Sequence, residues 1–181
     1  NAEIILQKVP ASGVPMRLGP LLVFENSFYT VVTVSKEMEA VGAASVMLAE
    51  AGRSAVTQAA AVIAATTEIE VGTYVVNAFA RSPWLTGLTA RDLDEMSGGR
   101  FVLGVGTGNP NFNNWYMGID SSRPLNAMRD FVNIVREVVA APAGTRPNAE
   151  QRRSSKSSVP GFDTASSFVP LDRSVCRQTL P

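Results

Sequence analysis

Short apolar runs alternate with segments of helical periodicity along residues 16–141, and this alternation constrains the fold more than any other feature. The predicted strands are Arg17–Phe24, Ser45–Glu50, Glu68–Asn77 and Arg100–Gly104. The predicted helices are Val31–Val41, Ser54–Thr66, Pro83–Met96 and Arg123–Val139. Strand–helix units joined by short turns predict an α/β fold with a parallel sheet. The pattern leaves open whether the sheet is doubly wound or belongs to a TIM-type (β/α)8 barrel.

Local signals mark the ends of the helices. Ser54 and Ser82 are expected N-caps, and Pro83 suits the first turn of a helix because it lacks an N–H group. Gly42 and the run Ser97–Gly99 are expected to stop the helices that precede them.

Residues 142–181 have a different composition from the preceding part of the chain. Pro142, Pro147, Pro160 and Pro170 interrupt this stretch, and Gln151–Ser158 is a polar run of Arg, Lys and Ser. No strand is predicted here, although a few apolar side chains around Phe168 could dock on a core. We therefore divide the chain into an N-terminal extension (1–15), four strand–helix units (16–141) and a partly irregular tail (142–181).

The composition excludes several classes of function. The formal net charge is zero, which gives no indication of a nucleic-acid partner. Histidine is absent, so histidine-based triads and imidazole metal ligands are excluded, and no metal site is predicted. Apolar runs such as Ala59–Ala65 are much shorter than the ~20 residues of a membrane span. The single Cys176 fits a reducing cytoplasm.

A cofactor signature is suggested by Leu93–Gly108, which runs from a helix end through a Gly-Gly turn and a strand into a glycine-rich loop. It departs from the dinucleotide fingerprint G-x-G-x-x-G, because Asn109 occupies the place of the third glycine and Pro110 follows it. The glycines could leave room for a flat ring, or they could simply permit a tight strand exit.

Polar residues follow the predicted strands at the edge where α/β proteins bind ligands. Glu50 could act as a general base, or it could form a salt bridge with Arg53 or another basic residue. Asn77 could bind a ring edge or form a turn, and Arg81 could contact an anion or cap a helix. Trp115-Tyr116 could line a pocket or form the loop's own packing cluster.

Several motifs occur in the order typical of one family. They are Thr66–Thr73, Val76-Asn77 with Arg81-Ser82-Pro83, Leu93–Gly106, and Pro124-Leu125 with Met128-Arg129. Together they resemble the luciferase-like monooxygenase superfamily over roughly residues 16–147. The Asn-x-x-x-Arg-Ser-Pro segment is most similar to the branch that includes methylenetetrahydromethanopterin reductases and other F420-dependent enzymes.

The resemblance implies about half of a TIM-type barrel, with FMN or coenzyme F420 bound at the barrel mouth for hydride or oxygen chemistry on a small-molecule substrate. It implies a bulge, often with a non-prolyl cis peptide, at Val75–Asn77 against the face of the ring. The implied cofactor-binding residues are Val76, Asn77, Arg81, Thr107 and Gly108, with Glu50 as the catalytic candidate. Many relatives have histidine after the acidic residue, whereas Ala51 follows Glu50 here.

An alternative function is a truncated, non-catalytic half-barrel that oligomerises or only binds a ligand. Half of a barrel would leave two strand edges and one apolar face without neighbours. A homo-oligomer, or a tail folded over that face, would cover them.

Overall fold

Parallel strands alternate with helices through the part of the chain that the structure, a computed structural model, describes (residues 19–23, 27–142 and 166–169). The strands are β1 (Leu21–Leu22), β2 (Ser45–Leu48), β3 (Glu70–Thr73), β4 (Val76–Asn77), β5 (Phe101–Gly106) and β6 (Ser166–Val169). The helices are α1 (Phe28–Ala40), α2 (Ala55–Ala65), α3 (Pro83–Ser97) and α4 (Pro124–Ala140), with a π-helical turn η1 (Phe112–Tyr116).

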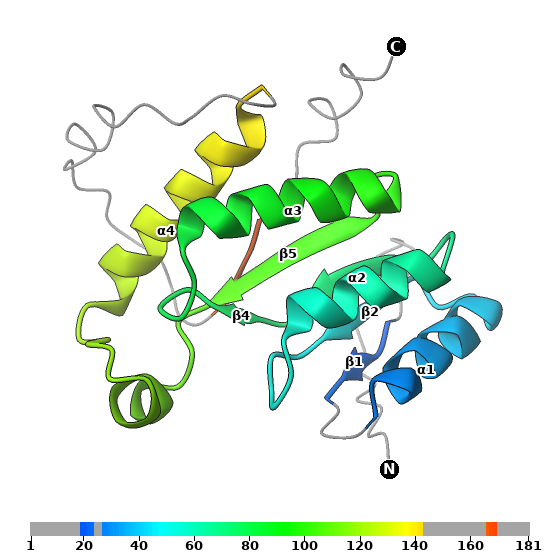
Figure 1. The fold of residues 1–181 in the computed structure, drawn as a ribbon, viewed down its shortest axis with the longest axis horizontal. Helices are drawn as coiled ribbons and strands as arrows, with labels where there is room; N and C mark the ends of the chain where they lie inside the picture. Colours follow the sequence, from blue (N-terminus) through cyan, green and yellow to red (C-terminus); the bar gives the residue numbers. More distant parts are fainter. Residues whose placement is uncertain (1–18, 24–26, 143–165, 170–181) are drawn as a thin grey trace, which may run out of the picture.

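The order of the strands identifies the type of sheet. β1, β2, β3 and β5 lie side by side in chain order, and every one of these pairs is parallel. Figure 1 shows the helices on one side of this sheet. A doubly wound sheet reverses its strand order and carries helices on both faces, whereas a (β/α)8 barrel adds each strand–helix unit in the same direction. The described residues therefore form consecutive units of the barrel type.

The predicted strand Glu68–Asn77 is interrupted by a bulge. Val71 pairs with Phe101 and Val76 pairs with Val105, so five residue steps on one strand face four on β5. A cis peptide bond joins Tyr74 to Val75 at this point, as the family resemblance implied. The extra residue divides the strand into β3 and β4, which both pair with β5. Such bulges redirect the strand that follows them.

One strand lies in the tail, where none was predicted. β6 pairs antiparallel with β5, with Val169 opposite Leu103 and Ser166 opposite Gly106. In a closed (β/α)8 barrel a parallel strand would pair with β5 in the place that β6 occupies here. Residues 143–165 and 170–181 of the tail and the N-terminal extension (1–15) lie outside the described residues.

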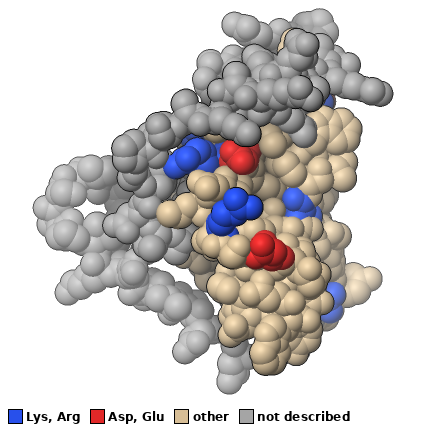
Figure 2. Space-filling view, turned by 90° about the vertical axis from the view of Figure 1, so that its left-hand side faces the viewer, with Lys and Arg blue, Asp and Glu red and all other residues tan. Residues whose placement is uncertain are grey.

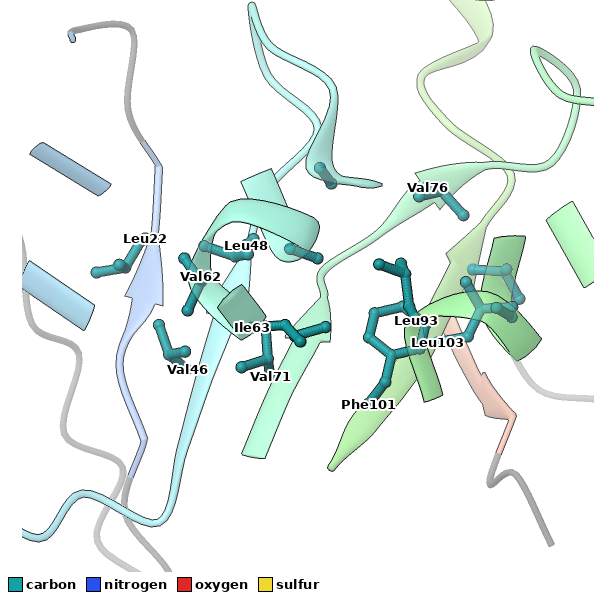
Figure 3. Close-up of a cluster of buried hydrophobic side chains, with 14 of the residues drawn as sticks. Leu22, Val46, Leu48, Val62, Ile63, Val71, Val76, Leu93, Phe101 and Leu103 are labelled. Atoms are coloured by element: carbon teal, nitrogen blue, oxygen red, sulfur yellow. The ribbon is translucent and has the colours of Figure 1, made fainter. Parts of the chain in front are cut away.

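The core lies between the sheet and the helices. Figure 3 shows side chains from β1, β2, β3, β4 and β5 meeting side chains from α2 and α3. Val46, Leu48, Val62, Val71 and Val105 are completely buried. Along β2, Val46 and Leu48 are buried and their neighbours are half-buried. One face of this strand therefore packs against the helices.

The predicted helix boundaries agree with the structure at several ends. The Ser54 and Ser82 hydroxyls accept N–H bonds from Thr57 and Leu85, as N-caps do. Gly98 ends α3 in the left-handed conformation, at φ +65°. α1 begins at Phe28, three residues before the predicted Val31, because the Ser27 hydroxyl caps it through Tyr29 N.

Two charged side chains hold the linker between α2 and β3. One oxygen of Glu39 accepts bonds from the backbone N–H groups of Thr67, Glu68 and Ile69, at 2.8, 2.6 and 3.0 Å. The Arg100 guanidinium donates to the carbonyl oxygens of Ile63, Thr66 and Ile69. A cation at the carboxyl end of α2 satisfies carbonyls that have no partner within the helix. The amino ends of β3 and β5 are therefore fixed to the helix layer.

The stabilisation that Glu39 gives to the linker between α2 and β3 should depend on pH. Desolvation alone would raise the pKa of Glu39, but the three backbone bonds and nearby Arg100 outweigh it, so the pKa lies below 4.5. The stabilisation is therefore fully present above the unfolded-state value and is lost as pH falls through the folded-state value. We expect Glu39→Gln to lower the free energy of unfolding by about 1–2 kcal/mol at pH 7, with a smaller difference at pH 3.

Urea unfolding at pH 7 and pH 3 measures this difference. Glu37→Gln, on the exposed side of the same helix, is the matched control. A Glu39→Gln deficit that is equally large at both pH values would contradict the proposed role of the charge.

Candidate functional site

The predicted site residues lie where β2, β4 and β5 end. Glu50 follows β2, Val76 and Asn77 form β4, and Thr107 and Gly108 follow β5. Arg81 lies four residues beyond Asn77 and directly before the N-cap of α3. Because the strands are parallel, these ends share one edge of the sheet, the edge that carries the active sites of (β/α)8 barrels.

The bulge is supported by a close contact between β3 and Gly104 of β5. A Cβ atom at Gly104 would lie 2.0 Å from the carbonyl oxygen of Thr73, so only glycine permits the backbones to approach this closely. The Thr73 hydroxyl donates to the Gly104 carbonyl oxygen and accepts from the Gly104 N–H, both at 2.9 Å. A side chain thus replaces the backbone pairing that the bulge interrupts.

Asn77 connects β4 to the loop that follows β5. Its Nδ2 donates to Asn113 Oδ1 at 2.6 Å, and its Oδ1 accepts from Phe79 N at 3.0 Å. Asn113 is fully buried and in turn donates from Nδ2 to the carbonyl oxygen of Thr107 at 2.9 Å. Gly108, at φ +68°, lies against the Asn77 amide, and an added Cβ would come within 2.4 Å of Nδ2. The structure therefore brings Asn77, Thr107 and Gly108 together.

Glu50 and Arg81 form an ion pair. Arg81 Nη2 donates to Glu50 Oε1, Nε donates to Oε2 at 3.3 Å, and Nη2 also donates to the Ser54 hydroxyl at 3.1 Å. The two side chains are 26% and 23% exposed, so the pair lies at the surface of the edge rather than in the core. The salt bridge weighed for Glu50 in the sequence is therefore present, and Arg81 is a partner in it.

The turn η1 exposes aromatic side chains. Trp115 and Tyr116 are 86% and 83% exposed, and Phe112 is 50% exposed. Phe112 and Tyr116 stack with ring centroids 5.4 Å apart. Tyr116 thus packs against a ring of its own loop, whereas Trp115, the other residue considered for a packing cluster, is largely exposed. Figure 2 shows Lys, Arg, Asp and Glu side chains near the middle of the described surface on this side of the molecule.

A pocket of about 220 Å³ lies elsewhere, on the helix side of the sheet. Val56, Leu85, Leu93, Phe101 and Leu103 supply apolar walls, and Arg81 borders one end. The hydroxyls of Thr86 and Thr89, which also line it, donate to carbonyl groups of the same helix region. The pocket is therefore separate from the bulge, and it offers few polar groups to recognise a ligand.

The sequence did not identify Asn113 and Thr73 as residues that shape the site. It included Gly104 in a motif but did not predict its contact with Thr73. Asn113 is one of several asparagines between residues 109 and 114, and nothing in their order distinguishes the buried one.

Among the described residues, no group of His, Cys, Asp and Glu could hold a metal ion. None of the described helices combines the length and apolar character required to cross a bilayer.

Comparison with known proteins identifies the family. The sequence model of the luciferase-like monooxygenase family matches residues 11–161. The chain belongs to this family. The strand–helix units from β1 to α4 therefore belong to a luciferase-like domain.

Two kinds of relative share this domain. A Mycobacterium tuberculosis protein assigned as a coenzyme F420-dependent oxidoreductase is 36% identical over 103 residues, which cover 56% of this chain and 30% of that protein. The 5,10-methylenetetrahydromethanopterin reductase of Archaeoglobus fulgidus is 38% identical over 79 residues, covering 43% of this chain and 23% of the relative. The chain thus matches less than a third of the length of these relatives.

The solved structure of the oxygenating constituent of 3,6-diketocamphane monooxygenase from Pseudomonas putida, in complex with FMN, has the same fold. Its TM-score is 0.60 at 19% identity, and the match covers 68% of this chain and 39% of that one. At this level of identity the comparison establishes the fold alone: the described residues form part of a TIM-type barrel.

The contact at Gly104 gives a direct prediction. Gly104→Ala would place a methyl group against the Thr73 carbonyl, and relief requires moving β3 or the bulge. We expect a loss of about 2–3 kcal/mol in the free energy of unfolding. Gly118→Ala is the control: nothing lies within 4 Å, so only the left-handed φ of +63° opposes it, at about 1 kcal/mol. Equal losses in urea unfolding would contradict the close-contact account.

Proposed function

We propose that this luciferase-like chain contributes to a flavin- or F420-dependent oxidoreductase, and that the ring of FMN or coenzyme F420 binds against the bulge between β3 and β4. The observation that carries the proposal is the register shift across from Gly104, which redirects Val76 and Asn77 at the carboxyl edge of the sheet. The F420-dependent relatives and the FMN-bound structural neighbour support this choice of cofactors.

The residues at the edge fit a flat ring. Gly108 lacks a side chain and is exposed, and Thr107 beside it is half-buried, so a ring could approach the backbone of this loop. Asn77, in contrast, already donates to Asn113 and accepts from Phe79. We therefore assign Thr107 and Gly108 to contact with the ring, and Asn77 chiefly to positioning β4 and the loop. Val76, which the sequence suggested as a further ring contact, is completely buried in the core, so it holds β4 in place rather than facing a ligand.

Glu50 and Arg81 are assigned a shared polar role. A bidentate pair between a carboxylate and a guanidinium fixes the orientation of both groups. Glu50 would hold Arg81 at the edge, where the guanidinium could contact an anionic part of the cofactor or substrate. A role for Glu50 as a general base would require it to release Arg81 first. A bound flavin or deazaflavin would supply the redox chemistry, while the protein provides binding and orientation.

A second function is a ligand-binding or oligomerising half-barrel without catalysis. The observation that favours it is β6, because an antiparallel strand on the free edge of β5 occupies the place of the next parallel strand of a barrel. Under this alternative the edge residues could still bind a ring without turning over a substrate.

Fluorescence titration with FMN and with coenzyme F420 tests the proposed function. Thr107→Trp would place a large side chain over the proposed ring site, so we expect at least a ~10-fold rise in Kd. Met96→Trp, at the carboxyl end of α3 and at the opposite edge of the sheet, is the control and should bind as the unmodified chain does. Binding that is unaffected by Thr107→Trp would contradict the proposed site, and absence of binding to either cofactor would contradict the function.

A further inference from the structure

The aromatic side chains of η1 require an explanation beyond packing of the loop. Phe112, Trp115 and Tyr116, which we call the aromatic platform, are 50%, 86% and 83% exposed. Clusters of aromatic side chains exposed to water are uncommon on soluble proteins, and where they occur they mark interaction sites. Trp and Tyr are also the residue types that dominate binding energy at recognition sites.

The platform is attached to the proposed ring site. Asn113, the one buried residue of η1, receives a bond from Asn77 and donates to the Thr107 carbonyl. Its carbonyl oxygen also accepts from Ile119 N at 2.9 Å, which closes the loop behind the aromatic residues. Figure 1 shows this turn beyond the carboxyl end of β5, on the same side as β4. The aromatic side chains are thus fixed beside the bulge rather than on an independent loop.

The chemistry of the platform indicates an uncharged occupant. No Asp, Glu, Lys or Arg occurs between Arg100 and Asp120, so the whole segment that builds β5 and η1 is uncharged. A charged ligand would lose hydration there without gaining a partner from this segment. Flat aromatic side chains favour offset-stacked or edge-to-face contact with other rings.

The size of the platform disfavours a protein partner. An aromatic side chain offers at most about 250 Å² when fully exposed, so these three, at their exposed fractions, offer at most roughly 550 Å². A stable protein interface needs about 800 Å² from each partner. A small molecule needs much less surface, and the platform lies next to the place where we propose the ring to bind.

We infer that the aromatic platform binds the substrate, and that this substrate presents an uncharged, planar apolar group. The inference rests on the proposed function for the position of the cofactor, and it adds the class of substrate. Trp115, the most exposed of the three, is assigned as the main contact. Tyr116 and Phe112 are a stacked pair in the same turn, and Asn113 is a positioning residue.

Binding of a defined probe tests this inference. 2-Naphthol is the uncharged planar probe, and 2-naphthoate is its anionic counterpart. The chain contains two tryptophans, so Trp84→Phe leaves Trp115 as the sole reporter. We expect 2-naphthol to quench Trp115 fluorescence in this variant, and 2-naphthoate to bind at least about fivefold more weakly by calorimetry.

Substitutions then locate the site. Trp115→Ala should raise the calorimetric Kd for 2-naphthol about 10-fold, whereas Trp115→Phe should largely retain binding. Val41→Ala, which removes a 78% exposed apolar side chain at the other end of the helix layer, should leave the Kd unchanged. Tyr116→Ala provides a second variant in case Trp115→Ala fails to fold.

Each other outcome has a defined meaning. Equal 2-naphthol binding by Trp115→Ala and the unmodified chain would overturn the inference. A dimer in sedimentation equilibrium that Trp115→Ala converts to monomer would identify a second copy as the occupant and would also overturn it. If the chain binds 2-naphthol but neither FMN nor coenzyme F420, the proposed function would be contradicted, while the platform would remain a binding surface.

Discussion

The approach of the Thr73 carbonyl to the bare Cα of Gly104 is the contact on which the site depends. Any side chain at position 104 would occupy the space of that carbonyl oxygen. Because the backbones meet there, β3 accommodates an extra residue and the strand resumes as β4 in a shifted register. The shift determines where the half-buried Asn77 lies at the carboxyl edge, while Val76 stays in the core.

The two edges of the sheet are built differently. At the amino edge, Glu39 and Arg100 bind the backbone of the α2–β3 linker with short, charge-assisted bonds. At the carboxyl edge, polar side chains bond to one another: Asn77 to the buried Asn113, and Glu50 to Arg81 in a partly exposed pair. One edge therefore stabilises the barrel units, and the other presents groups that a ligand can reach, which is the usual division in (β/α)8 proteins.

The sequence predicted the elements better than it predicted the contacts. Helix caps at Ser54, Ser82 and Gly98 follow from local chemistry and were confirmed. Residue pattern alone predicted one strand over 68–77, because a bulge depends on what the neighbouring strand permits. Only the family resemblance implied an interruption there. β6 was missed because a strand added at an edge depends on an available partner rather than on its own periodicity. Asn113 was missed because burial, not residue type, distinguishes it from its neighbours.

A ¹H–¹⁵N NMR titration of the chain with FMN, and in parallel with coenzyme F420, tests the central claim most directly, because backbone amides report on both candidate locations at once. We expect the largest chemical-shift changes at Asn77, Thr107 and Gly108, around the bulge. The pocket between α2 and α3, lined by Leu85, Thr89 and Leu93, should change little. Changes concentrated at that pocket, with the bulge unaffected, would contradict the account.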